Sequence, residues 1–182
     1  MATKKKPKEP LVRCNGTMTE SQYLAWIRSA LRSKSLRWPP RAACLVAARK
    51  PYKGDNARQK WSYECAICHN SFATKEVVVD HHPHEAGSIL SVEDIGPFAN
   101  RLYCEVDNLR CLCKTCHDIH TLSCKNGITF EEARIQKEII RISKLPKQEL
   151  LAYLGQEGYS GESVSNDKKR RACVELILNK GE

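Results

Sequence analysis

Apolar residues recur at helical spacing near the start of the chain, between residues 20 and 34. They occupy positions i, i+3, i+4, i+7 and i+8, which places them on one face of a helix. That face comprises Tyr23, Trp26, Ile27, Ala30 and Leu31. Thr19 and Gln22 stand at the spacing of a capping box. We therefore expect a helix that begins after Thr19 and reaches about Lys34.

Prolines, glycines and capping residues set the bounds of the other helical patterns. The pair Pro39–Pro40 stops the first helix and predicts a second one over residues 41–50. Thr129 and Glu132 form another capping box, which predicts a helix to about residue 144. We expect two further helices over residues 146–154, closed by Gly155, and over residues 167–179, with a flexible loop at 155–165 between them.

The middle of the chain has the pattern of short strands instead. Glu76–His81 contains three consecutive valines and is the best strand candidate. Shorter strands are expected over residues 61–63 and 109–112, and a helix is expected to begin near Lys114. The stretch 84–106 is interpreted as a long loop of the kind that is functional or has local structure of its own. The pattern as a whole predicts an α+β fold.

Charge and cysteine content narrow the environment and the partners. The 182 residues include 30 Lys and Arg against 21 Asp and Glu, a net charge of +9 that favours a polyanionic partner such as nucleic acid. The basic start is followed by no apolar segment typical of a signal peptide, and the longest apolar run, residues 42–48, is too short to span a bilayer. We therefore expect an intracellular, reduced protein without a membrane partner.

Two C-x-x-C pairs, Cys65 with Cys68 and Cys113 with Cys116, indicate one tetrahedral zinc site. Each pair forms a tight turn that directs two thiolates toward the same ion, so we expect one structural zinc per chain. The remaining cysteines are then free thiols or core residues: Cys14, Cys44, Cys104, Cys111, Cys124 and Cys173.

The residues between these knuckles resemble the HNH endonuclease family, also called ββα-metal nucleases. The motif residues are Cys65, Cys68, Val79-Asp80-His81, Gly87, Asn108-Leu109, Leu112-Cys113 and Cys116-His117, and the match covers about a third of the chain. The resemblance implies an α+β fold with a small ββα-metal core, stapled by the four-cysteine zinc site, at residues 61–128. A basic arm with helices at residues 1–60 and a helical extension at residues 129–182 would flank this core.

The resemblance also implies roles for individual residues. His81 is then the general base, Asp80 and His117 hold a catalytic Mg²⁺ or Mn²⁺, and Asn108 positions the loop that bears His81. The sequence departs from the family pattern at two positions. His82 follows His81, so either histidine is a candidate base, and His120 occupies a position where a lysine is common. His82, His120 and His84 are therefore additional candidates.

Basic residues outside the motif are candidates for contacts with nucleic acid: Lys4–Lys8, Arg28, Arg32, Arg49, Arg58, Lys60, Lys168, Lys169, Arg170 and Arg171. Residues 28–32 and 38–41 resemble the region ahead of the core in some tailed-phage HNH endonucleases. This implies a phage or prophage origin, with the host cytoplasm as the location. The tail from Pro146 loosely resembles a SAP-like DNA-binding element, but its few apolar and basic positions favour a small satellite pair of helices.

Two classes of function fit these residues. The first is a metal-dependent DNA endonuclease acting on double-stranded DNA, and no residue distinguishes this substrate from RNA. The alternative is a non-catalytic, zinc-stabilised nucleic-acid-binding module, such as a regulator or a packaging adaptor. Both classes predict zinc and basic charge. They differ at Asp80, His81, Asn108 and His117, which a module that only binds has no reason to combine.

Overall fold

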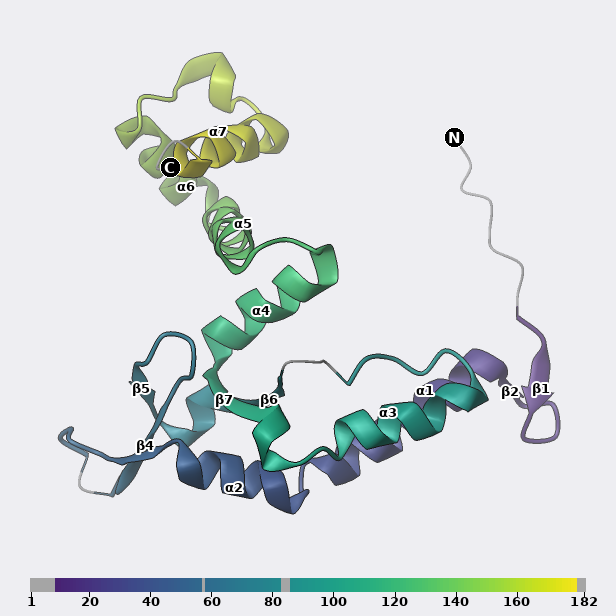
Figure 1. Ribbon diagram of the computed structural model, residues 1–182. Coiled ribbons are helices and arrows are strands. Elements are labelled where there is room, and N and C mark those ends of the chain that lie inside the picture. The colour runs from purple at the N-terminus through teal and green to yellow at the C-terminus, as the bar shows by residue number, and fades with distance from the viewer. Residues whose placement is uncertain (1–8, 57, 83–85, 180–182) are drawn as a thin grey trace. The chain divides into compact units, whose positions relative to one another are not determined.

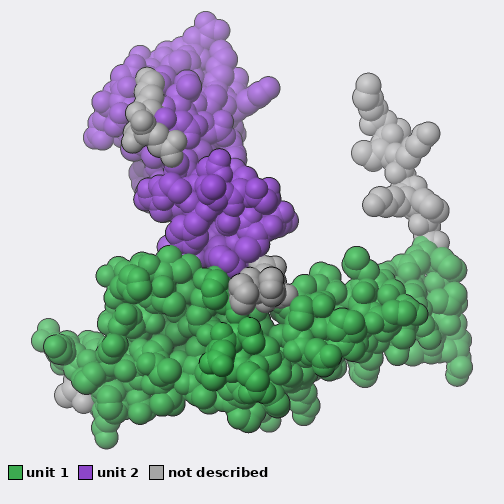
Figure 2. Space-filling model, viewed as in Figure 1, with its two compact units in different colours: residues 1–114 green, residues 115–182 purple. Residues whose placement is uncertain are grey.

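The computed structural model describes residues 9–56, 58–82 and 86–179 and has a mixed α+β fold (Figure 1). The chain divides into two compact units, residues 1–114 and residues 115–182, which are drawn in different colours in Figure 2. Each unit is described by itself below. In the described part of the chain, no helix combines the length and the apolar character needed to cross a membrane.

The first unit contains three helices and three small antiparallel sheets among its described residues. The helices are α1 (Glu20–Ser35), α2 (Pro39–Ala47) and α3 (Ile95–Leu102). The strands are β1 (Leu11–Arg13) with β2 (Met18–Thr19), β3 (Arg49–Pro51) with β4 (Trp61–Glu64) and β5 (Ser71–Phe72), and β6 (Val77–His81) with β7 (Leu109–Cys113). The predicted strands at residues 61–63, 76–81 and 109–112 are therefore confirmed to within one residue at each end.

Helix α1 begins at the capping box that the sequence predicts. The Thr19 hydroxyl accepts a hydrogen bond from the Gln22 N–H (3.2 Å), and the Gln22 side chain accepts one from the Thr19 N–H (2.9 Å). The predicted buried face is wrong at two positions, however, because Trp26 is 62% exposed and Ala30 is also exposed. Leu24 faces the core in their place, since α1 packs there against Phe98 and Leu102 of the short helix α3.

Helix α2 is displaced from its predicted range of residues 41–50. Both prolines lie inside its first turn, where a missing N–H costs no helical hydrogen bond, and the helix ends at Ala47. Residues 49–51 form strand β3 instead, because their backbone pairs with β4, with Arg49 opposite Tyr63 and Pro51 opposite Trp61. Local helical propensity is overridden here by strand pairing.

The predicted long loop at residues 84–106 has helical structure of its own. A 3₁₀ turn, η2 (Val92–Asp94), leads into α3. The Asp94 carboxylate accepts hydrogen bonds from the N–H groups of Leu90 and Ser91, both at 2.9 Å, which fixes the start of this helical segment. The pair Gly96–Pro97 lies in the first turn of α3, where proline is tolerated, so it does not mark a loop as its composition suggested.

Strands β6 and β7 form a two-stranded ladder that holds the motif residues. Val77 pairs with Cys113, Asp80 with Arg110, and His81 with Leu109. Short 3₁₀ turns, η1 (Thr74–Glu76) and η3 (Val106–Asn108), precede the two strands. One hydrophobic core cluster lies on this ladder and consists of Cys44, Val77, Val79, Leu109 and Cys111. The three valines that predict the strand thus include two that anchor it in the core.

The helix α4 (Lys114–Asn126) follows β7 directly, at the position that the sequence predicts. The second unit continues with α5 (Phe130–Ser143), α6 (Lys147–Gln156), η4 (Gly161–Val164) and α7 (Asp167–Asn179). The bounds of α5 and α7 confirm the predictions. Helix α6 runs past Gly155, which is wrong as its predicted end, and the first glycine with left-handed backbone after the helix is Gly158 (φ 83°). The predicted flexible loop at 155–165 contains the 3₁₀ turn η4.

Candidate functional site

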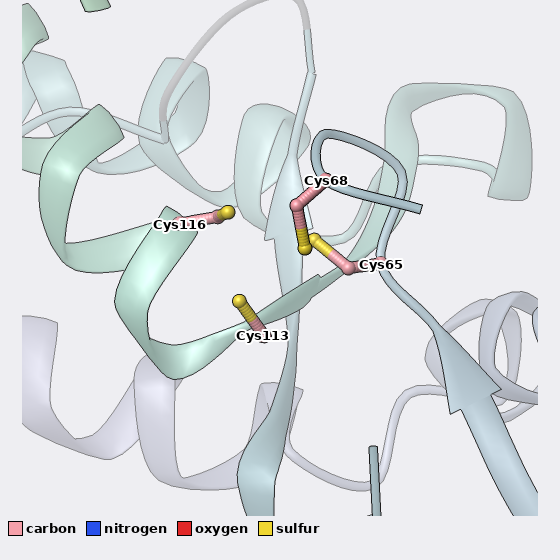
Figure 3. A group of neighbouring side chains, drawn as sticks. All are labelled: Cys65, Cys68, Cys113 and Cys116. Atoms are coloured by element: carbon pink, nitrogen blue, oxygen red, sulfur yellow. The ribbon is translucent and has the colours of Figure 1, made fainter. Parts of the chain in front are cut away.

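The four cysteines of the two knuckles form a candidate metal centre. The sulfur atoms of Cys65, Cys68, Cys113 and Cys116 all lie within 4.8 Å of one another, and Figure 3 shows them directed toward a common point. Four thiolates with this geometry could hold a metal ion such as Zn²⁺, whose tetrahedral sites place sulfur about 2.3 Å from the ion. Across residues 9–56, 58–82 and 86–179, no other group of three or more such ligands gathers this closely.

Backbone hydrogen bonds shape the first knuckle. The N–H of Cys65 donates to the Asn70 carbonyl (3.0 Å), and the N–H of His69 donates to the Cys65 carbonyl (2.9 Å). His69 takes a left-handed backbone conformation (φ 57°), which lets the chain turn back after the second cysteine. The N–H of Ala66 donates to the Cys111 carbonyl (2.9 Å), so the knuckle is joined to strand β7.

The local environment separates ligand from non-ligand cysteines. Burial raises the pKa of Cys65, but N–H groups of Cys68, Cys113 and Ile67 donate toward its sulfur, and the net effect lowers its pKa to about 7. Burial raises the pKa of Cys111 to about 11, and the nearby thiols of Cys44, Cys65 and Cys113 act in the same direction. Cys65 is thus prepared to bind metal as a thiolate, whereas Cys111 remains a thiol in the core.

Asp80 lies in strand β6 and pairs with Arg110 on the neighbouring strand. Both Nε (3.2 Å) and Nη2 (3.1 Å) of Arg110 donate to the same carboxylate oxygen. The Asp80 side chain is only 11% exposed and the Arg110 side chain only 16%, so this ion pair is largely buried. Sequence analysis missed Arg110. The signal was present in the strand register, since pairing β6 with β7 places residue 110 opposite residue 80.

We predict that Arg110→Gln lowers the free energy of unfolding by about 3 kcal/mol, because removing one partner of a buried ion pair leaves a buried charge uncompensated. The matched control is Lys50→Gln, which breaks the more exposed pair between Lys50 and Glu64 (3.2 Å) in the same unit. An exposed pair contributes about 0–1 kcal/mol. Urea unfolding followed by circular dichroism measures both values, and equal losses for the two variants would contradict the prediction.

The ring of His81 is held by one hydrogen bond to main chain. Its Nε2 lies 3.1 Å from the carbonyl oxygen of Leu102, at the C-terminal end of helix α3. A carbonyl oxygen carries no proton, so Nε2 must be the donor. The neutral ring then has its lone pair on Nδ1. This arrangement fixes both the tautomer and the nitrogen that can accept a proton.

Two aromatic side chains hold the segment to which His81 is bonded. The indole N–H of Trp38 donates to the Cys104 carbonyl (2.8 Å), and the Tyr103 hydroxyl donates to the Leu31 carbonyl (2.8 Å). The two rings meet edge to face with centroids 5.5 Å apart. The sequence places Trp38 only in the segment 38–41, which ends a helix and resembles the region ahead of the core in some HNH endonucleases, and it gives no prediction for Tyr103. Their positioning role depends on tertiary contacts between distant segments, which sequence spacing does not reveal.

His82 and Asn108 meet through their main chains. The N–H of His82 donates to the Asn108 carbonyl (2.9 Å), and the thiol of Cys104 also approaches that carbonyl (3.7 Å). This contact uses only the Asn108 backbone, so the positioning role of its side chain stays a prediction. The His82 side chain is exposed, and its ring makes no hydrogen bond with any residue that the structure describes. Of the two histidines, His81 is the oriented one.

His117 and His120 lie on helix α4. The half-exposed ring of His117 has Nδ1 3.8 Å from the carboxylate of Asp118, and the ring of His120 approaches the thiol of Cys124 within 3.5 Å. His117 belongs to the second unit, so its meeting with Asp80 at one ion stays a prediction. His84 and Lys4–Lys8, which the sequence also proposed, lie outside the described residues.

The predicted nucleic-acid contacts in the first unit are exposed cations. Arg28, Arg58 and Lys60 point into solvent by their exposure. Arg32 places its guanidinium 5.6 Å from the ring centre of Phe98 and donates to the Gly87 carbonyl (3.3 Å). These residues remain available to a polyanion.

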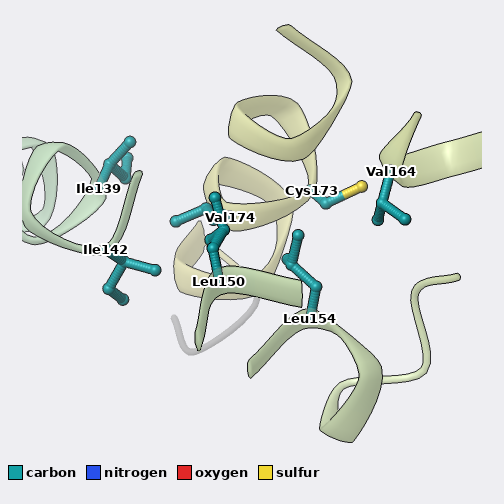
Figure 4. Close-up of a cluster of buried hydrophobic side chains, with 7 residues drawn as sticks. All are labelled: Ile139, Ile142, Leu150, Leu154, Val164, Cys173 and Val174. Atoms are coloured by element: carbon teal, nitrogen blue, oxygen red, sulfur yellow. The ribbon is translucent and has the colours of Figure 1, made fainter. Parts of the chain in front are cut away.

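The basic run at the start of α7 has a different character. Arg170 is only 7% exposed; its Nη1 donates to the Val164 carbonyl (2.7 Å), and its Nη2 pairs with Asp167. This burial argues against the predicted role of Arg170 in nucleic-acid binding. The same helix packs Cys173 and Val174 into the core of the second unit, with Ile139, Ile142, Leu150, Leu154 and Val164 (Figure 4). Lys169 and Arg171 pair with Glu162 (3.2 Å) and Glu175 (3.0 Å), whereas Lys168 is exposed.

Comparison with known proteins identifies no relative. No protein-family model, no curated protein and no solved structure matches this chain. The fold and the site therefore define a class: this is an α+β chain with a four-cysteine cluster that could bind a metal ion. Function has to be argued from the residues themselves.

Proposed function

We propose that this protein is a metal-dependent DNA endonuclease that hydrolyses phosphodiester bonds with His81 as general base. The observation that carries the proposal is the hydrogen bond between His81 Nε2 and the Leu102 carbonyl (3.1 Å), which leaves the lone pair of Nδ1 to accept a proton. The adjoining residue, Asp80, supplies a carboxylate from the same strand. A histidine held in one tautomer, with the lone pair of its other ring nitrogen open, has what a general base needs to take a proton from water.

The chain's own residues have distinct tasks in this reaction. His81 Nδ1 takes a proton from the attacking water, and the oxygen then bonds to phosphorus while the bond to the 3′ oxygen breaks. The Asn108 carbonyl holds the main chain after His81 through its hydrogen bond with His82. Asp80 and His117 would hold a divalent ion. When bound, that ion supplies Lewis-acid stabilisation of the phosphoryl and leaving oxygens.

The donor set suits Mg²⁺ or Mn²⁺, because a carboxylate oxygen and one imidazole leave most coordination positions to water and phosphate. In the described structure Arg110 bonds the Asp80 carboxylate through one oxygen, Oδ2. A bound divalent ion would share that carboxylate with Arg110, so the arginine both neutralises Asp80 before metal binding and fixes its rotamer. The four-cysteine cluster would hold a structural Zn²⁺, whose task is to stabilise the fold.

The same ion pair favours a second candidate function. A carboxylate that is already paired in a largely buried site needs no metal, as expected of a zinc-stabilised module that only binds nucleic acid. The two functions make opposite predictions in one assay, which is incubation of the purified protein with supercoiled plasmid. Nicked or linear product with Mg²⁺ or Mn²⁺, and none without them, supports the nuclease. No product with any divalent ion, despite normal zinc content and DNA binding, supports the module.

His117→Ala should lower the cleavage rate in Mg²⁺ by at least about 100-fold, since it removes a proposed ligand of the catalytic ion. Excess Mn²⁺ should restore part of the rate, because Mn²⁺ binds nitrogen- and oxygen-containing sites more tightly than Mg²⁺ does. The matched control is His69→Asn, which replaces an exposed histidine at a left-handed position that asparagine also adopts. Initial rates across a metal titration measure both. A His117→Ala rate equal to that of the control would remove His117 from the site.

A further inference from the structure

We propose that the β3–β4 hairpin is the element on which nucleic acid docks. In this proposal Lys53, Arg58 and Lys60 contact phosphates, and the stacked pair of Arg49 and Trp61 contacts the backbone beside them. The inference deepens the proposed function by naming where the substrate is held, and it rests on that function for the identity of the polyanion. The loop that carries these cations joins β3 to β4 and extends beyond the ends of both strands (Figure 1).

The hairpin loop concentrates positively charged side chains. Lys53, Arg58 and Lys60 are exposed, and none forms an ion pair with any residue that the structure describes. The one acidic side chain in the loop is Asp55. Several arginines elsewhere are neutralised locally, since Arg134, Arg141 and Arg171 each pair with a glutamate on the same helix. A group of unpaired cations in one short loop is a surface of high positive potential.

The strand register explains the place of Trp61. Arg49 is paired with Tyr63 and Pro51 with Trp61, so these four side chains share one face of the hairpin. Tyr63 packs against the core cluster on β6 and β7, whereas Trp61, two residues earlier, lies beyond that core and is 41% exposed. The face of the hairpin that carries Tyr63 thus continues outward past the core to Trp61, whose indole ring lies next to the basic loop.

Arg49 holds its guanidinium over that indole, 4.2 Å from the ring centre. Stacking alone would shield part of the ring, which is a structural role. The Arg49 side chain makes no hydrogen bond or ion pair with the described residues, so its N–H donors are available. A pre-oriented guanidinium with open donors suits bidentate contact with phosphate.

The opposite face of the hairpin does not share this character. Lys50 pairs there with Glu64 (3.2 Å), and an open pocket on that side is lined by Glu64 and Glu76 as well as by Lys53. The paired strand residues on the face with Arg49 and Trp61, in contrast, include no acidic side chain. Cations along the β3–β4 hairpin, at the edge of this three-stranded sheet, can follow the phosphates of duplex DNA.

The test compares two triple variants of the full-length protein, which each lose three positive charges. One is Lys53→Gln with Arg58→Gln and Lys60→Gln in the hairpin. The other is Lys125→Gln with Lys144→Gln and Lys147→Gln, three exposed lysines of the second unit. Affinity for a 20-base-pair duplex is measured across a salt series without added divalent ion. The hairpin variant should bind about tenfold more weakly, and its log–log salt slope should be shallower by about two to three units.

A second measurement reports on Trp61 directly. Duplex DNA should quench tryptophan fluorescence in the parent and in Trp26→Phe, which removes another exposed indole. It should quench little in Trp61→Phe, and Arg49→Gln should reduce both the quenching and the affinity. Circular dichroism and zinc content confirm that each variant is folded.

Three results would overturn the proposal. They are equal affinities and salt slopes for the two triple variants, quenching that persists in Trp61→Phe, or equally tight binding of poly-glutamate by the parent. Because these measurements contain no divalent ion and no cleavage step, they separate docking from catalysis. Weak binding by the hairpin variant together with an inactive parent would support docking while contradicting the nuclease. If the parent cleaves DNA in a metal-dependent way but the two triple variants bind equally tightly, the nuclease is supported and the docking proposal is contradicted.

Discussion

Replacing His81 by alanine is expected to lower the rate of plasmid cleavage by about 10²–10⁴-fold, the usual contribution of a general base. Zinc content and DNA affinity should stay close to those of the parent, because a base acts on the transition state and adds little to ground-state binding. The side chain lies at the end of β6 and is held only through Nε2, so its removal leaves the core cluster intact. Single-turnover rates at saturating protein measure the effect.

His82→Ala is the control for this prediction. His82 is exposed and contributes its main-chain N–H, which alanine retains, so the variant should cleave at nearly the parental rate. An inactive His82→Ala with an active His81→Ala would exchange the two roles. Nitrogen-15 NMR of the histidine rings gives an independent readout, since the Leu102 carbonyl requires the tautomer with the proton on Nε2 of His81. The opposite tautomer would remove the structural argument for this base.

Local rules predicted much of the fold. The capping boxes at Thr19 and Thr129 set the starts of α1 and α5, and the valine run set β6, because these signals lie within a few adjacent residues. The gathering of the four cysteines was also predicted, since each C-x-x-C turn is local and one metal ion needs both pairs. These features depend on short-range chemistry, which the sequence displays directly.

The parts that sequence analysis missed depend on contacts between distant segments. The partner of Asp80 is Arg110 because β6 and β7 pair in one register, and His81 is oriented by Leu102 because α3 ends beside it. The burial of Arg170 likewise follows from its hydrogen bond to the η4 turn, which composition suggested was a flexible loop. The sequence supplied the candidate base and ligands, and the tertiary structure supplied the residues that hold them in place.

Cys68→Ser is expected to abolish zinc binding and to unfold the part of the protein built around the knuckles. Structural zinc sites bind with apparent free energies of about 10–16 kcal/mol in small peptides. That range equals or exceeds the whole stability of a typical domain, about 5–15 kcal/mol. Cys65, Cys113 and Cys116 are buried around the same point, so without the ion three thiol groups would be left in the interior with no metal to bind.

Two further serine substitutions separate loss of zinc from loss of a sulfur atom. Cys14 is an exposed thiol outside the cluster, and Cys14→Ser should match the parent in zinc content and melting temperature. Cys44 is buried in the core on β6 and β7, so Cys44→Ser should cost about 1–3 kcal/mol through burial of a hydroxyl while one zinc per chain remains. Elemental analysis and thermal unfolding with and without a chelator measure these outcomes. Protons compete with the ion for the thiolates, so less chelator should suffice at lower pH. A folded Cys68→Ser protein that contains no zinc and melts with the parent would show that the four cysteines do not hold the fold through a metal.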